Sequence, residues 1–574
     1  MAGKWSPLTN QPTFNASTML LLTDGTVLCQ DGDANDWWKL TPNQTGDYLN
    51  GTWSALARGP NSPLYYASAV LRDGRVFVAG GEYNAGAQVD LLAAEIYDPL
   101  TNTWTSIATP AGWSNIGDAP SCVLPDGRVL LGSINDTRTA IYDPVANNWT
   151  AGPNKGDASS EETWTLLPDE TVLAIQCTNH PHTEKFVIAA NTWLTAGATP
   201  SDLVEAASIE TGPCLLLPDG RLFVIGASGH TALYSFPPIA SQLGSWAAGP
   251  DFPKVSAQQL GAKDAPGCLL PNGRVLCAVG PVDGVSGHYL SPTYFYEFDP
   301  VSSTLTAVPN PPTNGGPPYV GRMLLLPSGQ VLFATGSNNI QAYTPDSAPD
   351  PAWIPSITSC PTFLQANHTY TLFGRQLNGL SQAVSYGDDA QMATNYPLVK
   401  IRNNATGHVF FCRTHDHSTM SVNTGTVIRS TRFDVHAGIE LGASQLTVIA
   451  NGISSNPIAV SVGLVKITKE IIKEKDLKEI KEKDLKEIEK LQKEIEKLKD
   501  AETIDGQGAV VDPELLQSAL RDLTNRVGQV EEQIATGRSF IAPEERPDVG
   551  EQATQALSEG KGSRAGGAGK LPRP

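Results

Sequence analysis

Long apolar runs and charged side chains are both scarce in this 574-residue chain. Only 17% of its residues are charged, and no apolar run approaches the roughly 20 residues that a membrane-spanning helix needs. The amino terminus, MAGKWSPLTN, lacks a basic start followed by an apolar core, so it does not resemble a signal peptide. The sequence therefore predicts no membrane span, and a location that is either cytoplasmic or reached by export without a conventional signal peptide.

Basic residues and cofactor motifs are also scarce. The chain has 40 Lys and Arg against 59 Asp and Glu, a net charge of −19, which repels the phosphates of nucleic acids and anionic lipids. It has no GxSxG nucleophile motif, no phosphate-binding P-loop and no HExxH zinc motif. None of its eight cysteines forms a CxxC pair, which favours small buried thiols in a reducing compartment. These absences predict a protein with no cofactor and no nucleic-acid partner.

Glycine and proline are abundant, at 53 and 43 residues, and this composition suits short strands joined by tight turns. The strongest pattern is an apolar run, a two-residue turn and a second apolar run, as in LLLTDGTVLCQ and CLLLPDGRLFVIG. Asp-Gly and Asn-Gly pairs favour hairpins because glycine adopts a positive φ without strain. The pattern occurs seven times, with turns at Asp24-Gly25, Asp73-Gly74, Asp126-Gly127, Asp169-Glu170, Asp219-Gly220, Asn272-Gly273 and Ser328-Gly329.

The turns lie 43 to 56 residues apart, which is close to the spacing of four-stranded propeller blades. A third strand that ends in a turn follows most hairpins, at residues 95–99, 140–144, 233–237, 296–300 and 341–345. A tryptophan then follows at Trp53, Trp104, Trp149, Trp193 and Trp246. We expect these rings to pack between neighbouring sheets rather than to bind a ligand. Residues 4–8 have the pattern of a lone outer strand, which we expect to complete the last sheet and remove its free edge.

This repeat resembles the kelch repeat over residues 4–350, although the double glycine of kelch blades occurs only at Gly80-Gly81. The resemblance implies a seven-bladed kelch-type β-propeller over residues 1–351. Residues 352–463 keep the β pattern without the turn motif, and segments 368–374, 397–401, 408–412 and 445–450 are typical of strands in an immunoglobulin-like β-sandwich. A propeller followed by such a sandwich resembles the galactose oxidase and glyoxal oxidase superfamily, and residues 386–420 are similar to bacterial kelch-repeat proteins. The predicted fold is all-β with an α-helical coiled-coil tail.

The oxidase resemblance can be tested on the residues that would bind copper. Enzymes of that superfamily use two tyrosines, two histidines and a cysteine cross-linked to a tyrosine, with a Tyr-His pair ahead of the LLLPDG hairpin. In the matching stretch of this chain, residues 318–329, Tyr319 is present but Val320 stands in the place of the histidine. Because valine cannot bind copper, the sequence disfavours copper-radical chemistry at Tyr319.

Two His-x-His pairs are further candidates for metal binding. Alternate residues of a strand point to one face, so His415 and His417 could present two imidazoles together, as could His180 and His182. We take His415 and His417 as the candidate metal site, with a hydrogen-bonded polar loop as the alternative. The carboxylates at positions 388 and 389 could bind a cation or could be solvated turn residues.

The composition changes at residue 464, since 23 of the 37 residues in 464–500 are charged. We predict a Lys/Glu-rich coiled-coil helix over 464–500, a linker over 501–511, a second heptad helix over 512–537, and a docking peptide with a disordered tail over 538–574. The apolar seam consists of Ile488, Leu491, Ile495, Leu498, Leu516, Leu520, Leu523, Val527, Val530 and Ile534. We expect this seam to hold a homo-oligomer together. An intramolecular helical hairpin and a heterologous partner helix are the alternatives.

These features predict an oligomeric binding protein that presents its propeller to a glycan or a protein, with the coiled coil multiplying weak contacts. The alternative is an oxidoreductase related to the copper-radical oxidases, with a displaced or altered metal site. No catalytic residue can be assigned on either hypothesis.

Overall fold

The computed structural model describes residues 3–32, 34–387, 392–463 and Lys493. Residues 1–464 form one compact unit, and residues 465–574 form a second. In the described residues, the strands are accompanied by three short 3-10 helices, η1 (Ile188–Ala190), η2 (Pro318–Val320) and η3 (Pro351–Trp353). The all-β prediction is therefore confirmed. The two predicted helices and all ten seam residues from Ile488 to Ile534 lie outside the described residues.

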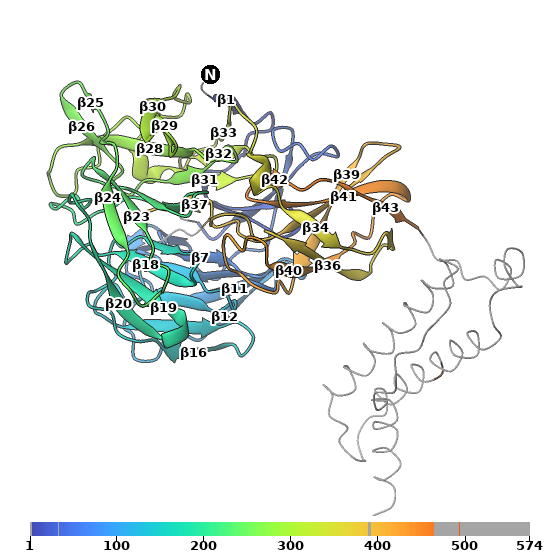
Figure 1. The fold of residues 1–574 in the computed structure, drawn as a ribbon, viewed down its shortest axis with the longest axis horizontal. Coiled ribbons are helices and arrows are strands. Elements are labelled where there is room, and N and C mark those ends of the chain that lie inside the picture. Colours follow the sequence, from blue (N-terminus) through green and yellow to red (C-terminus); the bar gives the residue numbers. More distant parts are fainter. Residues whose placement is uncertain (1–2, 33, 388–391, 464–492, 494–574) are drawn as a thin grey trace, which may run out of the picture. The chain divides into compact units, whose positions relative to one another are not determined.

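Seven antiparallel four-stranded units, called sheets 1 to 7 here, follow one another along residues 4–344 (Figure 1). Sheet 1 contains β2 (Ala16–Leu21), β3 (Val27–Asp31), β4 (Trp37–Thr41) and β5 (Thr52–Ala55). Sheet 2 contains β7 (Ala67–Val70), β8 (Val76–Ala79), β11 (Ala94–Asp98) and β12 (Thr103–Ile107). Sheet 3 contains β13 (Ser121–Val123), β14 (Val129–Gly132), β15 (Thr139–Asp143) and β16 (Asn148–Ala151). Sheet 4 contains β17 (Trp164–Leu166), β18 (Thr171–Ile175), β19 (His182–Val187) and β20 (Thr192–Ala198).

Sheets 5 to 7 repeat this order. Sheet 5 contains β21 (Cys214–Leu216), β22 (Leu222–Ile225), β23 (Thr231–Ser235) and β24 (Ser245–Ala248). Sheet 6 contains β27 (Gly267–Leu269), β28 (Val275–Val282), β29 (Tyr294–Asp299) and β30 (Thr304–Ala307), and is extended through β28 by β26 (Gln258–Gly261) and β25 (Lys254–Val255). Sheet 7 contains β31 (Arg322–Leu325), β32 (Val331–Ala334), β33 (Gln341–Thr344) and β1 (Lys4–Pro7). A small separate sheet contains β6 (Pro63–Leu64), β9 (Tyr83–Asn84) and β10 (Ala87–Gln88).

The first strands of the seven sheets contact one another in a closed series, from β2 through β7, β13, β17, β21, β27 and β31 back to β2. The series closes because β1, from the amino-terminal segment, pairs with β33, placing Trp5 opposite Tyr343. This pairing confirms the predicted role of residues 4–8. It also gives the outer strand of sheet 7 a partner from the opposite end of the repeat region, so no inner edge is left open.

Each of the seven predicted turns connects the first two strands of its sheet. In the first turn, Gly25 has a φ of 76°, and the side chain of Asp24 accepts a hydrogen bond of 3.0 Å from the Thr26 N–H. Glu170 takes the glycine position in the fourth turn and adopts a φ of 60°, which costs a residue with a Cβ about 1–2 kcal/mol. The local chemistry of the pair Asp-Gly therefore explains why these turns could be found in the sequence.

The tryptophans of the outer strands lie between neighbouring sheets, as predicted. Trp104 of sheet 2 donates its indole N–H to the Ala57 carbonyl, just beyond the outer strand of sheet 1, at 3.1 Å. The same kind of bond runs from Trp149 to the Ala108 carbonyl, at 2.6 Å. Equivalent bonds are made by Trp5, Trp53 and Trp246. An aromatic ring with one polar edge therefore joins each of these sheets to the one before it.

The carboxy-terminal strands form a second β region beside the ring (Figure 1). They are β34 (Ser356–Ser359), β35 (Phe363–Leu364), β36 (Thr369–Arg375), β38 (Leu398–Asn403), β39 (Val409–His415), β40 (Ile428–Asp434), β41 (Gly442–Ala450), β42 (Ile453–Ser454) and β43 (Ile458–Val462). Pairing joins them into one sheet in the order β34-β36-β40-β39-β38-β41-β43-β35, with β42 beside β41. All four strands predicted in this region are present. Their own core includes Leu372, Val399, Phe433 and Val448.

One segment of the carboxy-terminal region leaves this sheet and enters the ring. Its strand β37 (Val384–Ser385) pairs with β27, the first strand of sheet 6, and Figure 1 draws it among the blue and green sheets. The Leu166 N–H of sheet 4 donates to the Gln382 side chain at 3.0 Å, and the Cys214 N–H of sheet 5 donates to the Ser385 hydroxyl at 3.3 Å. This segment therefore satisfies polar groups of three first strands at the centre of the ring.

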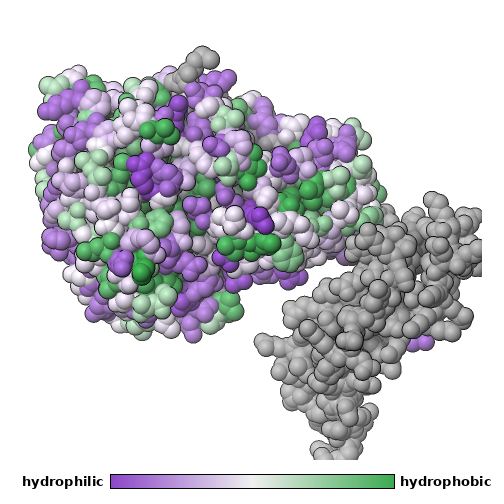
Figure 2. Space-filling view, viewed as in Figure 1, coloured by the Kyte–Doolittle hydropathy of each residue, from purple (hydrophilic) through white to green (hydrophobic). Residues whose placement is uncertain are grey.

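The described surface shows no sign of a membrane-directed region. None of the helices in the described part of the chain has the length and apolar character of a membrane span. Among exposed apolar residues, Val145 and Val301 lie in turns, and Figure 2 shows polar and apolar side chains interspersed on the face drawn.

Candidate functional site

The loops that lead into the first strands converge on a pocket of about 360 Å³. The turns described above lie at the other end of these strands, so the pocket and the Asp-Gly turns are on opposite faces of the ring. Its lining combines tyrosines with carboxylates: Leu64, Tyr65, Glu82, Tyr83, Asp118, Glu161, Glu210, Asp264, Tyr289, Tyr319 and Tyr386. A concave site with convergent polar groups is the expected form of a ligand site.

Four of the carboxylates occupy the same place in four successive repeats. Asp118, Glu161 and Asp264 each stand three residues before a first strand, and Glu210 stands four residues before one. Because the first strands form a closed ring, residues at this position face the same central space. Oxygens of Glu161, Glu210 and Asp264 all lie within 4.8 Å of one another. In the described part of the chain, this is the one group of three His, Cys, Asp or Glu side chains so closely placed.

The backbone is unusual at these positions. Tyr65, Glu161 and Asp264 have φ values of 55°, 59° and 46°, in the left-handed region that residues with a Cβ seldom adopt. Ile209, directly before Glu210, has a φ of 64°, which is a strong departure for a β-branched residue. Such conformations cluster at sites where the chain must aim a side chain into a fixed position, and persist because the surrounding structure holds them.

The three carboxylates repel one another. Two unit charges 4.8 Å apart repel by about 3 kcal/mol at an effective dielectric constant of 20. Glu210 is 4% exposed, and the Tyr289 hydroxyl donates a hydrogen bond to its Oε1. Its buried Oε2 has no hydrogen-bond partner among the residues that the structure describes. Burial and the charges of Asp264, Glu210 and Glu161 raise the pKa of Tyr289, so this phenol remains a donor at ordinary pH.

The nearest basic side chains are held by other groups. Lys263 donates to the Ser208 hydroxyl at 2.6 Å and lies 3.5 Å from a Glu205 carboxylate oxygen, with its ammonium 4.3 Å from the centre of the Tyr289 ring. Arg322 lies under the tyrosines and donates to the Tyr319 carbonyl at 2.8 Å. Neither is among the residues that line the pocket.

The inserted segment contributes Tyr386 to the pocket. Its hydroxyl donates to the Tyr319 carbonyl at 2.6 Å, and its ring centre lies 4.0 Å from the Arg322 guanidinium. The Tyr319 ring is 4.7 Å from that of Tyr289 and 6.4 Å from that of Tyr65. Tyrosine rings from sheets 2, 6 and 7 and from the inserted segment thus form one side of the site.

The donor set does not fit the copper-radical centre that the sequence resemblance implied. All nine histidines of the chain are described, and none lines the pocket. Tyr319 is in the lining, but Val320 follows it in η2 and offers no ligand atom. The eight cysteines are free thiols, and seven of them are buried. Carboxylates and phenols are hard oxygen donors, whereas copper in such sites is bound by imidazoles as well.

The histidines predicted as a metal site make separate contacts. His415 ends β39, and Asp416 follows with a φ of 50°, so the alternation expected of a strand stops before His417. The ring nitrogens of His415 lie 2.9 Å from Asp416 and 3.1 Å from Asp434. His417 is buried, its Nδ1 lies 2.9 Å from the Thr431 hydroxyl, and burial lowers its pKa to about 3. These contacts match the polar loop stated as the alternative, and a shared metal ion stays a prediction.

The remaining sequence candidates do not gather around a common point. His180 lies 2.5 Å from an Asp202 carboxylate oxygen, and His182 lies 3.0 Å from the Asn179 carbonyl. The carboxylates at positions 388 and 389 lie outside the described residues, just beyond Tyr386.

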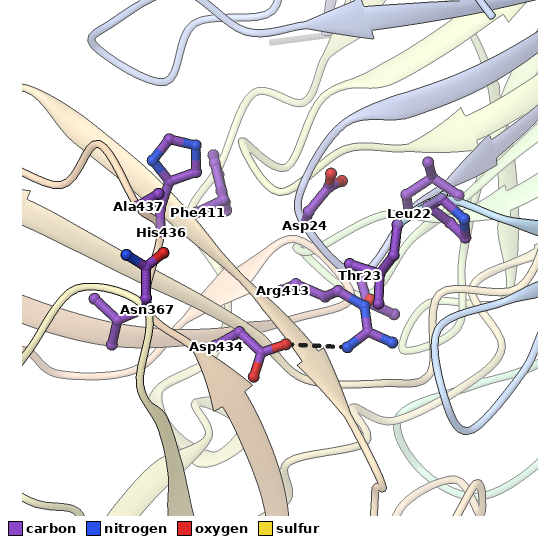
Figure 3. Close-up of a pocket in the computed structure, with 12 residues that line it drawn as sticks. Leu22, Thr23, Asp24, Asn367, Phe411, Arg413, Asp434, His436 and Ala437 are labelled. Carbon is purple, nitrogen blue, oxygen red and sulfur yellow. Dashed lines mark hydrogen bonds and ion pairs between the residues drawn. The ribbon is translucent and has the colours of Figure 1, made fainter. Parts of the chain in front are cut away.

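A second pocket, of about 350 Å³, lies between the turn face of sheet 1 and the carboxy-terminal sheet. Figure 3 shows Leu22, Thr23 and Asp24 on one side of it and Phe411 and His436 on the other. Its charged side chains pair with each other, since Arg413 and Asp434 form an ion pair of 3.1 Å. The lining is mostly apolar, so we interpret this pocket as an imperfectly filled contact between the two β regions.

A Kelch motif matches residues 63–111, which span β6 to β12. The chain carries a Kelch motif. N-acetylneuraminate epimerases from Yersinia pestis and Yersinia pseudotuberculosis are 32% identical to this chain over 103 residues, which is 17% of this chain and 25% of theirs. The match therefore spans about a quarter of the length of these curated relatives.

Two solved structures are also similar to the chain. One is a fungal alcohol oxidase of the AA5 family in complex with copper, with a TM-score of 0.49 and 14% identity, covering 81% of this chain and all of the oxidase chain. The other is a catalytically inactive virginiamycin B lyase from Staphylococcus aureus with quinupristin, with a TM-score of 0.43 and 11% identity, covering 60% of this chain and 99% of the lyase.

The sequence analysis missed the acidic residues of the pocket, although a signal for them exists. When the repeats are aligned on their turns, an acidic residue stands eight or nine residues before the turn in four successive repeats, at Asp118, Glu161, Glu210 and Asp264. Each of these residues alone is typical of a solvated loop. Only their common position predicts that they meet.

Proposed function

We propose that this protein is a binding protein whose axial pocket holds a sugar residue of a glycan. The observation that carries the proposal is the pocket lining, where five tyrosines stand among five carboxylates. Tyrosine rings offer flat apolar faces with a polar edge, and carboxylates accept hydrogen bonds from hydroxyl groups. A ligand with both apolar faces and many hydroxyl donors, such as a sugar ring, is complementary to this combination.

The charge of the pocket narrows the ligand class. Five carboxylates line it, and the nearest cations, Lys263 and Arg322, are engaged outside the lining. The partial relatives named above act on N-acetylneuraminate according to their names, and that sugar is an acid. A sugar carboxylate would meet repulsion in this pocket, so we propose a neutral or amino sugar.

A glycan screen with one pocket variant tests this function. Intact protein should bind at least one neutral or amino glycan, and Tyr83→Ala should weaken that binding by about tenfold because a stacking face is lost. Tyr83 is partly exposed and lies at the pocket, in the short strand β9. The control is Trp113→Ala, which removes a partly exposed aromatic ring outside the lining and should change nothing. Equal losses in both variants, or binding of acidic glycans alone, would contradict the proposal.

We also propose the finer architecture that the repeats suggest. In this proposal sheets 1 to 7 are the blades of a seven-bladed kelch-type propeller, and residues 352–463 form an immunoglobulin-like domain behind it. The closed series of first strands and the pairing of β1 with β33 support the blade count. The core around Leu372 and Phe433 supports a separate layer of side chains in the second region.

The tail completes the proposal as an assembly device. Leu523→Asp with Val527→Asp should convert an oligomer into a monomer, because two buried charges on each helix outweigh the rest of the apolar seam. Sedimentation of the intact protein and of the double variant measures this directly. A matched control is Glu531→Asp with Glu532→Asp, which keeps the charge of the same helix. An intact protein that sediments as a monomer would end the avidity hypothesis and leave the pocket to work alone.

A further inference from the structure

We infer that Glu161, Glu210 and Asp264 bind a divalent cation that prefers hard oxygen ligands, such as Ca²⁺. The inference goes beyond glycan binding and does not depend on it. Three carboxylates from three different loops reach one point, with their oxygens within 4.8 Å of one another. That spacing is what oxygens around a common cation require, since Ca²⁺–oxygen distances are about 2.3–2.6 Å.

The buried oxygen of Glu210 is an independent observation that points to a ligand. Glu210 is 4% exposed, and one of its oxygens accepts from Tyr289. The other, Oε2, is buried and has no hydrogen-bond partner among the described residues. An unpaired buried carboxylate oxygen is costly, and a cation bound beside it would satisfy it. The other two members of the group stand on the far side of the same small space.

The backbone supports a preformed site. Glu161 and Asp264 both have positive φ values, and the residue before Glu210 does too. These loops therefore place three like charges together at a conformational cost, where an ordinary loop would let them separate. The chemistry of the group selects the ion: carboxylate oxygens without imidazole or thiolate favour Ca²⁺, Mg²⁺ or Mn²⁺ over zinc or copper. We commit to Ca²⁺ as the probe because it tolerates irregular geometry.

The test uses the full-length protein, freed of metal with a chelator and titrated with CaCl₂ at constant ionic strength. We expect a saturable heat of binding near one ion per chain, and a rise in the thermal midpoint of about 3 °C when Ca²⁺ is a hundredfold above its Kd. Glu210→Gln keeps the shape of the side chain but removes its charge, and should weaken Ca²⁺ binding about tenfold or more. Without Ca²⁺, the same variant should melt at the same or a higher temperature, because a repelling charge is gone.

Glu82→Gln is the matched control, since Glu82 lines the same pocket but lies outside the group of three. It should bind Ca²⁺ within about threefold of the unchanged protein, because only a more distant charge is lost. If Glu210→Gln does not fold, Glu161→Gln takes its place, because Glu161 is partly exposed. No Ca²⁺ binding by the unchanged protein would overturn the inference. So would unchanged binding in both Glu210→Gln and Glu161→Gln, since the ion would then sit elsewhere. Failure of either kind leaves the glycan screen with its own outcome.

Discussion

A chain that ends at residue 351 should fail to fold as a soluble protein, whereas a chain that ends at residue 463 should melt close to the intact protein. The reason is the segment around β37, which belongs to the carboxy-terminal region but pairs with β27 inside the ring. Without it, the N–H groups of Leu166, Cys214 and Leu269 lose their acceptors. Each buried N–H left without a partner costs about 1–3 kcal/mol.

Packing adds to this loss. Val384, Tyr386, Tyr396 and Met420 belong to the same buried cluster as side chains of sheets 1, 2 and 7. Phe411 also packs directly against Gly25, where an added Cβ would lie 2.5 Å from the ring. Circular dichroism and size-exclusion chromatography of the two shortened chains measure the effect. A monodisperse, cooperatively melting 1–351 chain would show that the ring needs no support from the inserted segment.

A point variant separates the inserted segment from the rest of the region. Gln382→Ala removes the acceptor of the Leu166 N–H and keeps the remaining carboxy-terminal contacts, so it should lower stability by only part of the amount lost at residue 351.

The elements that could be predicted from the sequence are those whose cause is local. Each Asp-Gly turn carries its own conformational requirement, and each outer tryptophan follows a strand at a fixed distance, so both were found. The closing strand could be inferred because residues 4–8 had no partner of their own. These predictions needed only the residues in a short window.

The features that could not be predicted depend on distant parts of the chain. Strand β37 has two residues and no periodicity, and its pairing with β27 is decided by residues more than a hundred positions away. The acidic group is similar, because Glu161, Glu210 and Asp264 meet only when the ring closes. The His-x-His prediction relied on strand alternation, which Asp416 interrupts by a left-handed conformation that the sequence does not announce.

The second large effect is expected at the buried ion pair beside the pocket. The Lys155 ammonium lies 2.6 Å from both carboxylate oxygens of Glu162, and both side chains are fully buried. The Trp164 indole donates to the same carboxylate at 2.9 Å. Since Glu162 directly follows Glu161, this pair also fixes the loop that carries one member of the acidic group. Lys155→Met should therefore lower the free energy of unfolding by about 3–5 kcal/mol, because it leaves Glu162 buried without its partner.

The pH dependence of that loss identifies its cause. Burial raises the pKa of Glu162 to about 7, with Lys155 limiting the rise. A carboxyl whose folded pKa exceeds its unfolded value, about 4.3, binds more protons in the folded state between those two values, so its contribution to stability falls as the pH rises through that range. In the intact protein this fall ends near pH 7. Without Lys155 the folded pKa is higher still, so the fall continues above pH 7, and the variant should be close to the intact protein at pH 5 and much weaker at pH 8.

Urea unfolding at pH 5 and pH 8 measures both effects. The double variant Lys155→Met with Glu162→Gln should recover most of the stability at pH 8, because no buried charge remains to be neutralised. Arg58→Met is the matched control, since Arg58 pairs with Asp36 at the surface with 70% of its side chain exposed, and such a pair contributes about 0–1 kcal/mol. A loss in Lys155→Met that is the same at both pH values, and that the second substitution does not relieve, would assign the effect to packing against Trp193 rather than to the stranded carboxylate.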